Sequence, residues 1–447
     1  MISSRLCPET KKEMTLQAQK LGRDIRQAEQ VTGVLMKINM DQSLSGLKVA
    51  IVHDYLNQMG GAEHVVKVFR EIFPNAPIYT SIYVPSAVCP SFKTAEIHTS
   101  FMQRLPMIRK HARRYLPLYP YAFEQFDFSA YDIVISSSSA FAKGVVTPPH
   151  TCHICYCYTP MRFVWNYHTY IEQEPYTRLT KLCLPYVIHR LRRWDEITAN
   201  RPDEYIAISG EIKRRIEKYY RRDSTIIHPP VDTSRFRVGT RDDGYYLILS
   251  RLLPYKRIDV AIQAFNNLRL PLKIVGTGRD LDRLQKLVGP TIEFLGRLPD
   301  DEMHRCLRNC RALIFPGLED FGLAPIEAMA CGKPAIAYAA GGALETVREG
   351  VSGTFFYNQT PEDIAKAVSD FDVDRYDPKA IRRHAELFDV SVFKQEILRF
   401  VTNKYDEYQR LPLLPGGERF GILARVGPRF LDPDNRERTS HAPIDRG

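Results

Sequence analysis

Long hydrophobic runs are absent from this chain of 447 residues. A membrane-spanning helix needs about 20 consecutive apolar residues, and no apolar run approaches that length. Residues 1–30 are polar throughout, without the apolar block of a secretory signal. These absences argue against an integral membrane protein, and we expect a soluble, cytoplasmic protein.

Cysteine is present, but not in the arrangement of a disulfide framework or a zinc site. Without a secretory signal, we expect the nine cysteines to be reduced thiols. Zinc sites usually pair two separated Cys-x2-Cys units, whereas this chain has one cluster. The cluster comprises His150, Cys152, His153, Cys155 and Cys157. We interpret it as small apolar residues on a buried strand, and we predict no metal site.

Acidic residues are outnumbered: 62 Lys and Arg face 52 Asp and Glu, for a net charge of +10. The excess is clustered in residues 104–114, 189–193 and 213–222. Each cluster alone is typical of a solvated helix face, but three in one half favour a phosphate-rich partner. No nucleic-acid-binding motif accompanies them, so we expect no nucleic-acid partner and favour an anionic membrane surface.

The length and composition indicate two globular domains. Apolar residues make up 44% of the chain and charged residues 26%, and 447 residues exceed one ordinary core. Pro229-Pro230 marks the linker between the domains. The predicted divisions are an N-terminal extension (1–45), a first domain (46–230), a second domain (231–390), a last helix that crosses back (391–411) and a disordered tail (412–447).

Alternating strand and helix patterns predict an α/β fold with doubly wound parallel sheets. Short apolar runs predict strands at residues 48–53, 132–135, 153–157, 204–208, 245–250, 272–275, 292–295, 312–315 and 334–337. Helices are expected at 62–73, from Ser209 as N-cap to about 220, over 258–265, after Thr360-Pro361 and over 391–411. We therefore expect two Rossmann-like domains that face each other across a ligand cleft.

The most informative stretch is residues 316–347, PGLEDFGLAPIEAMACGKPAIAYAAGGALETV. Glu319 follows a predicted strand, and Glu327 is expected in the first turn of a helix that begins near Pro325. In parallel sheets, ligands bind at the carboxyl ends of the strands, where this loop must lie. The backbone N–H groups of Phe321, Gly322 and Leu323 are suited to a phosphate or a sugar hydroxyl, and glycine lets the main chain approach closely.

A second phosphate-directed element is the loop SRLLPYKR of residues 250–257. Its Arg251 and Lys256 suit a diphosphate that becomes more negative as a glycosyl bond breaks. Fixed cations at that point stabilise the transition state and substitute for a divalent metal. Gly276 and Gly278, after the next strand, permit close approach to the donor. Each feature alone is a weak signal, and their order along the chain is what indicates function.

In this order, the elements are similar to the donor-binding signature of the retaining glycosyltransferases of family 4, which have the GT-B fold. The resemblance covers roughly residues 47–410. It implies that Arg251 and Lys256 hold the donor diphosphate and that Glu327 binds the ribose. It implies that Glu319 holds the transferred sugar together with the Phe321–Leu323 backbone. The implied catalytic residues are Glu319 and the two cations. The nucleobase is expected near 294–298, including Leu295. The Gly60-Gly61 loop is expected across the cleft, near the diphosphate and the acceptor. The resemblance makes 46–230 the acceptor-binding domain and 231–390 the donor-binding domain.

Two further segments resemble bacterial mannosyltransferases that build surface polysaccharides from GDP-mannose. They are YTPMRFVW at 158–165 and GGALE at 341–345. The resemblance implies GDP-mannose as the donor. The two cations make a divalent metal unnecessary. The basic clusters fit a peripheral enzyme at the inner face of the plasma membrane, whose acceptor is a glycan or is linked to polyprenyl diphosphate. Many relatives have a histidine where this chain has Tyr158. We expect Tyr158 and Arg162 to contact the sugar or acceptor, with a core tyrosine and a structural arginine as equal alternatives.

Three alternatives stay open at this point. The donor can be a UDP-sugar such as UDP-glucose, the enzyme can be an inverting one, or the chain can be a non-catalytic nucleotide-sugar-binding homologue. A dinucleotide-dependent oxidoreductase is disfavoured, because neither Gly60-Gly61 nor Gly276-x-Gly278 supplies the G-x-G-x-x-G fingerprint after a strand. The chain offers no convincing protein nucleophile.

Overall fold

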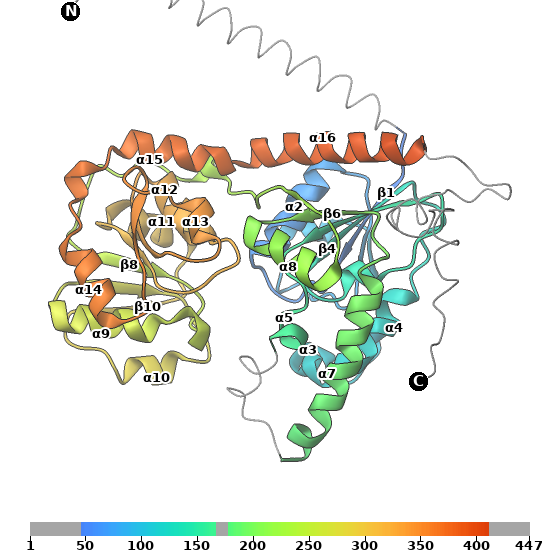
Figure 1. Cartoon of the computed structure of the whole chain (residues 1–447), viewed down its shortest axis with the longest axis horizontal. Coiled ribbons are helices and arrows are strands. Elements are labelled where there is room, and N and C mark those ends of the chain that lie inside the picture. Colours follow the sequence, from blue (N-terminus) through green and yellow to red (C-terminus); the bar gives the residue numbers. More distant parts are fainter. Residues whose placement is uncertain (1–45, 167–177, 411–447) are drawn as a thin grey trace, which may run out of the picture.

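The computed structural model describes residues 46–166 and 178–410. The predicted N-terminal extension and C-terminal tail lie outside these residues. The described residues form two α/β bodies side by side, each built on a parallel sheet, with one long helix along the first body (Figure 1). This arrangement agrees with the predicted fold class, and the predicted linker at Pro229-Pro230 lies between the two sheets.

The first sheet has seven strands in the order β3-β2-β1-β4-β5-β6-β7. They are β1 (Val49–His53), β2 (Ile78–Thr80), β3 (Ile97–Thr99), β4 (Ile133–Ser138), β5 (Cys152–Cys157), β6 (Glu204–Ala207) and β7 (Thr225–Ile226). Every residue of β1, β4 and β5 is buried, as expected for central strands covered on both faces. The buried cysteines of the sequence cluster therefore lie in β5, as predicted.

The helices of the first body are α2 (Gly61–Ile72), α3 (Ile108–His111), α4 (Tyr119–Glu124), α5 (Arg162–Trp165), α7 (Arg178–Thr198) and α8 (Gly210–Tyr220). Short 3-10 turns join them: η1 (Pro90–Thr94), η2 (Phe101–Arg104), η3 (Ala112–Leu118) and η4 (Ala142–Gly144). The N-cap predicted for α8 is confirmed, because the Ser209 hydroxyl accepts the N–H of Ile212 at 3.2 Å.

The second sheet has six strands in the order β10-β9-β8-β11-β12-β13. They are β8 (Tyr246–Leu249), β9 (Leu272–Val275), β10 (Ile292–Gly296), β11 (Leu313–Phe315), β12 (Ala335–Tyr338) and β13 (Gly353–Phe356). The surrounding helices are α9 (Ile258–Leu268), α10 (Leu281–Gln285), α11 (Asp300–Asn309), α12 (Leu323–Ala330), α13 (Ala343–Thr346), α14 (Pro361–Ser369) and α15 (Pro378–Ala385). Short turns are η5 (Thr233–Arg235), η6 (Pro254–Lys256), η7 (Val373–Arg375) and η8 (Glu386–Phe388).

The last helix, α16 (Val390–Gln409), leaves the second body and packs on α2 and β5 of the first, as predicted. The ring of its Phe393 lies 5.7 Å from the rings of Phe69 and Tyr156, measured between centroids. Figure 1 shows this helix running along one side of the first body, with α15 on the same side of the second. Helix α16 therefore follows the second body in the chain and packs on the first.

Within the described ranges, no helix is long and apolar enough to cross a membrane. In the same ranges, no group of three or more His, Cys, Asp or Glu is arranged to hold a metal ion. The eight cysteines found there form no disulfide.

Candidate active site

Chain order in the two sheets produces two switch points. In the first sheet the chain moves outward from β1 to β3 and returns to pair β4 with β1. In the second sheet it moves from β8 to β10 and returns to pair β11 with β8. Parallel sheets bind ligands at such points, outside the carboxyl ends of the strands. The loops after β1, β4, β8 and β11 are therefore the expected site.

The loop after β8 carries the two predicted cations. Arg251 is exposed, whereas Lys256, at the end of η6, has only 9% of its surface accessible. The ammonium group of Lys256 pairs with Glu319 Oε1 from the loop after β11. Burial, followed by the positive charges of Arg251 and Arg162, lowers the pKa of Lys256 to about 7. Three cations therefore converge on one place, as binding of a diphosphate requires.

Glycines bring the loops of the second sheet into backbone contact. A Cβ at Gly276 would lie 1.8 Å from the Ser250 carbonyl oxygen, and one at Gly278 would lie 2.1 Å from that of Leu252. Gly276 also has a φ of +137°, which side chains rarely adopt. The close approach seen here is thus between the two loops of the protein. Approach of these glycines to a donor stays a prediction.

The loop that carries Glu319 is held by the second glycine pair, Gly341-Gly342. The Gly342 N–H donates to the Glu319 carbonyl at 2.9 Å. A Cβ at Gly342 would lie 2.2 Å from Phe321 Cα. Gly322, with a φ of +97°, is the N-cap of α12 and leaves room for the ring of Phe315. These contacts fix the backbone of Phe321–Leu323 at a helix N-terminus.

The position predicted for Glu327 was wrong by one turn. Helix α12 begins at Leu323 rather than near Pro325, so Glu327 lies in its second turn. Pro325 is accommodated because the first-turn N–H groups have no partner within the helix. Burial raises the pKa of Glu327 to about 7, opposed by the positive charge of Arg235 and assisted by Asp300. A carboxyl with such a pKa is a candidate functional group.

The Gly60-Gly61 loop of the first body meets the glutamate loop of the second. Gly60 caps α2, and its N–H donates to Glu63 Oε2 at 2.8 Å. A Cβ at Gly61 would lie 2.9 Å from Leu323 Cδ1, so the two loops touch where the two bodies meet. The position of this loop near the diphosphate and the acceptor stays a prediction.

Tyr158 has two protein partners. Its hydroxyl donates to the Ala62 carbonyl at 3.0 Å and lies 2.9 Å from Ser137 Oγ. Burial raises its pKa well above the usual range, so the phenol stays protonated. Tyr158 thus ties the end of β5 to the first turn of α2, beside the Gly60-Gly61 loop. Its contact with a sugar stays a prediction.

Arg162, at the start of α5, pairs with Asp320 across the cleft. Arg215 of α8 binds the same carboxylate, with its Nη1 2.8 Å from Asp320 Oδ1. The Ser209 hydroxyl donates to the Asp320 carbonyl at 2.6 Å. The residue next to Glu319 is therefore held by three side chains of the first body. Contact of Arg162 with a phosphate or the acceptor stays a prediction.

Two carboxylates of this region were missed from the sequence. Asp320 was quoted only as part of a motif. Asp54, directly after β1, accepts the N–H groups of residues 139–142 at 2.6–3.0 Å and so shapes the loop after β4. The next residue, Tyr55, has its pKa raised to about 12, mainly by burial and by Asp54, while Arg251 acts in the opposite direction. The serine run at 136–139, at the end of the buried strand β4, was the available signal.

Leu295 lies near the end of β10, half-buried and close to the glycine loop, where Gly276 N–H donates to the Gly296 carbonyl at 2.7 Å. Its contact with a nucleobase stays a prediction.

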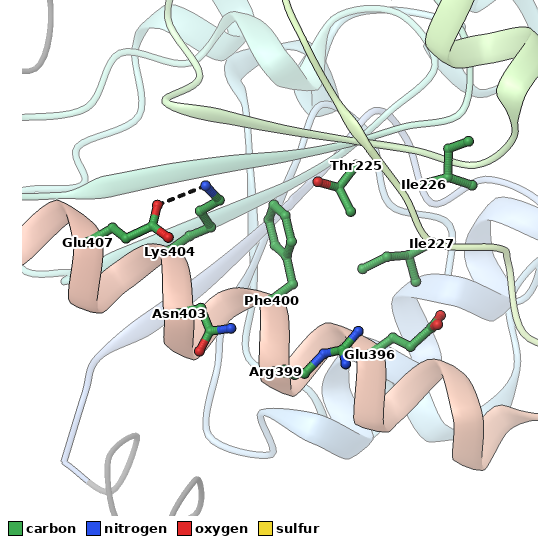
Figure 2. A pocket seen from close by; sticks show the side chains of 9 residues that line it. All are labelled: Thr225, Ile226, Ile227, Glu396, Arg399, Phe400, Asn403, Lys404 and Glu407. Carbon is green, nitrogen blue, oxygen red and sulfur yellow. Dashed lines mark hydrogen bonds and ion pairs between the residues drawn. The ribbon is translucent and has the colours of Figure 1, made fainter. Parts of the chain in front are cut away.

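A separate cavity of about 320 Å³ lies between β7 and α16, lined by residues including Ile226, Phe400 and Lys404 (Figure 2). It contains none of the predicted site residues.

Two family models match this chain. Residues 59–235 match "Glycosyltransferase Family 4", and residues 231–387 match "Glycosyl transferases group 1". An uncharacterised glycosyltransferase of Methanocaldococcus jannaschii is 28% identical over 171 residues, 37% of this chain and 48% of the relative. The GDP-mannose-dependent alpha-(1-6)-phosphatidylinositol monomannoside mannosyltransferase of Mycolicibacterium smegmatis is 31% identical over 219 residues, 42% of this chain and 56% of the relative. The chain spans about half the length of the curated relatives it matches.

Solved structures share the fold. Sucrose-phosphate synthase from Thermosynechococcus elongatus superposes with a TM-score of 0.62 at 16% identity, covering 80% of this chain and 100% of that one. Anabaena HepE in complex with UDP and glucose superposes with a TM-score of 0.58 at 17% identity, covering 80% and 99%. At such identities the likeness concerns the fold and does not bear on the donor.

Proposed function

The chain belongs to glycosyltransferase family 4 and has the GT-B fold, and from this premise we propose that it is a retaining hexosyltransferase that transfers mannose from GDP-mannose. The proposed acceptor is a glycan or a lipid-linked glycan in the synthesis of a cell-surface polysaccharide. The observation that carries the proposal is the pairing of buried Lys256 with Glu319, beside Arg251, at the switch point of the second sheet.

The cations act on the leaving group. In the reaction, the bond between the anomeric carbon of the sugar and a diphosphate oxygen breaks, and a bond to the acceptor oxygen forms on the same face. Negative charge collects on the diphosphate, and Arg251 and Lys256 stabilise it. The acceptor proton passes to the leaving phosphate oxygen. The step is balanced without a protein nucleophile.

The carboxylates orient the donor. Glu319 is freed to accept sugar hydroxyls when the diphosphate takes over its contact with Lys256. Glu327, once ionised, accepts hydrogen bonds from the ribose. The N–H groups at the start of α12 add a fixed positive end to the same place. No divalent metal is part of this proposal, because the cations supply the positive charge.

The choice of mannose and guanine rests on resemblance. It is supported by the segments at 158–165 and 341–345 and by the GDP-mannose-dependent relative from Mycolicibacterium smegmatis, which is 31% identical over 219 residues. We further propose a lipid-linked acceptor and a peripheral position on an anionic membrane. The basic clusters of the first body support this part.

The test is a donor screen with the full chain. Binding and slow hydrolysis of GDP-mannose are compared with those of UDP-glucose and ADP-glucose, by calorimetry and by release of the nucleoside diphosphate. We expect GDP-mannose to be preferred. Preference for a UDP-sugar would overturn the donor assignment, and failure of every nucleotide-sugar would overturn the enzyme assignment.

A variant pair tests the site itself. Lys256→Ala should abolish turnover while the protein stays folded by circular dichroism. Lys286→Ala, at the exposed residue directly after α10 in the same body, is the matched control and should keep full activity. Retained turnover in Lys256→Ala would contradict the role proposed for this lysine.

A further inference from the structure

Two segments of the first body contain no acidic residue. One is residues 97–123, and the other is residues 183–194 of α7. Their exposed cations include Arg104, Arg109 and Arg114 in the first segment and Arg190 and Arg193 in the second. A solvated helix face normally mixes both signs of charge, whereas the charged side chains of these two segments are all basic.

The same segments expose large apolar side chains. Tyr121 is 66% exposed, and Met107 and Tyr186 are each 62% exposed. Single exposed apolar residues are ordinary, but several within one acid-free surface are not. Met107 has a φ of +53°, a left-handed conformation that is uncommon for a side chain of this size. The Tyr115 hydroxyl holds this turn by donating to the Pro106 carbonyl at 2.8 Å.

The two segments form one continuous surface. Ile108 and Tyr119 from the first share a buried cluster with Ile188 and Leu191 from α7. Above this cluster, Arg190 donates to the Tyr186 hydroxyl at 2.6 Å and interacts electrostatically with Tyr121. Figure 1 shows α3, α4 and α7 at the same end of the first body, on the side opposite α16. We name this surface, formed by the exposed side chains of residues 101–121 and 183–193, the basic face.

We propose that the basic face docks on an anionic lipid membrane, with Met107, Tyr121 and Tyr186 entering the interface and the arginines contacting lipid phosphates. Tyrosine prefers the membrane–water interface, and clustered arginines bind anionic headgroups. The exposed side chain of Met107 gains free energy by leaving water, but it cannot pair with a nucleic-acid phosphate. This residue therefore favours a membrane over a nucleic acid as the partner. The inference deepens the proposed function, since it locates the contact that a lipid-linked acceptor would require.

The basic face is joined directly to the candidate site. Arg192 of α7 donates through Nε to the Val164 carbonyl of α5 at 2.8 Å. Helix α5 also carries Arg162, which reaches Asp320 beside Glu319. Docking of α7 therefore places the start of α5, and with it the cleft, near the membrane surface, where the head of a lipid-linked acceptor would be available.

The experiment is co-sedimentation of the full chain with vesicles, without donor or acceptor. Vesicles of phosphatidylcholine with phosphatidylglycerol are compared with vesicles of phosphatidylcholine alone, at low and high salt. We expect binding to the anionic vesicles only. Arg104→Glu, Arg109→Glu and Arg114→Glu combined should lower the partition coefficient at least roughly tenfold. Tyr121→Ser with Tyr186→Ser should weaken the part of the binding that persists at high salt.

The matched control reverses three exposed cations of the second body, Arg375, Lys379 and Arg383, with the same change in net charge. It should bind vesicles nearly as well as the parent chain. Equal losses in the two triple variants, or no binding by the parent chain, would overturn the proposal. So would binding to duplex DNA that the arginine variant loses and the tyrosine variant keeps, since the face would then bind polyanions in general.

Hydrolysis of the donor separates this inference from the proposed function. The arginine variant should still hydrolyse GDP-mannose at the parent rate, because none of its three positions belongs to the candidate site. Loss of vesicle binding with intact hydrolysis is the expected pattern. An inactive parent chain that still binds anionic vesicles would overturn the proposed function and leave the docking surface standing.

Discussion

At the scale of single residues, the candidate site holds two groups whose pKa values are displaced toward each other. Burial and two nearby arginines lower the pKa of Lys256 to about 7. Burial raises the pKa of Glu327 to about 7. The lysine must be charged to attract a diphosphate, and the glutamate must be ionised to accept from a ribose. The productive charge state is therefore most populated near pH 7.

We predict a bell-shaped dependence of kcat/KM on pH, centred near 7, because kcat/KM reports the groups of the free enzyme. The rate should fall as pH rises, when Lys256 loses its proton, and should fall as pH drops, when Glu327 gains one. The measurement is initial rate at limiting donor over a series of buffers of constant ionic strength.

Two conservative variants test which residue produces each limb of this bell-shaped pH profile. Lys256→Arg keeps its charge at every accessible pH and should flatten the alkaline limb. Glu327→Gln accepts through its amide oxygen at every pH and should flatten the acid limb, with a rate roughly tenfold lower from the weaker hydrogen bond. A profile unchanged in both variants would contradict these assignments.

At the scale of elements, helix α8 is positioned by a carboxylate from the opposite body. The Gly210 N–H donates to Glu345 Oε2 at 2.8 Å and to Oε1 at 2.9 Å, next to the local cap by Ser209. An anion at a helix N-terminus is stabilised by the helix dipole. This contact joins the glycine-rich segment at 341–345 to the helix that carries Arg215.

We predict that Glu345→Ala lowers both stability and activity, whereas a matched capping variant lowers stability alone. The control is Thr360→Ala, which removes the cap of α14, a helix that packs on α9 and β13. Each change should cost about 1 kcal/mol in thermal or urea unfolding. Only Glu345→Ala should also lower kcat/KM, by roughly tenfold. Equal activity of the two variants would mean that Glu345 acts as an ordinary cap.

These caps also explain what the sequence could predict. Ser209 and Thr360 cap N–H groups three residues away, so their roles follow from local pattern. The partner of Glu345 lies 135 residues away, which no local pattern indicates. The same holds for Asp54, whose partners lie 85 or more residues along the chain.

The strands that were predicted and those that were missed also differ in how strong their local pattern is. Buried central strands such as β4 and β5 were predicted because their apolar runs are continuous. Strands β2, β3, β7 and β13 were missed, with two to four residues each. The equally short β11 was predicted because its three residues are all apolar, whereas the missed runs contain polar residues or glycine. For such runs, pairing with a neighbouring strand decides whether a strand forms. The start of α12 lies two residues before the predicted start near Pro325, because no side chain caps the N-terminus of this helix and so no local cap signal marks it.

At the scale of the whole molecule, one residue joins the two bodies beside the site. Asp320 binds Arg162 and Arg215 through its carboxylate and Ser209 through its carbonyl. The side chains involved are mostly shielded, with 13% of Asp320, 17% of Arg215 and 22% of Arg162 accessible. Shielded pairs are screened less by solvent than exposed ones. The contact therefore favours a closed arrangement of the cleft, which excludes water from the donor.

We predict that Asp320→Asn opens this contact without unfolding either body. The variant leaves Arg162 and Arg215 with one counter-charge fewer. The loss is worth about 1.5–3 kcal/mol, as for hydrogen bonds to charged groups. The cleft should open more often, so kcat/KM should fall roughly tenfold to hundredfold. The ratio of donor hydrolysis to transfer should rise as water gains access, and the radius of gyration in solution should increase.

Asp374→Asn, at an exposed position of η7, is the control and should change none of these. If the cycle of Asp320→Asn with Arg215→Gln gives strictly additive losses, the two side chains are not coupled, and closure must depend on α16 and the Glu345 contact instead.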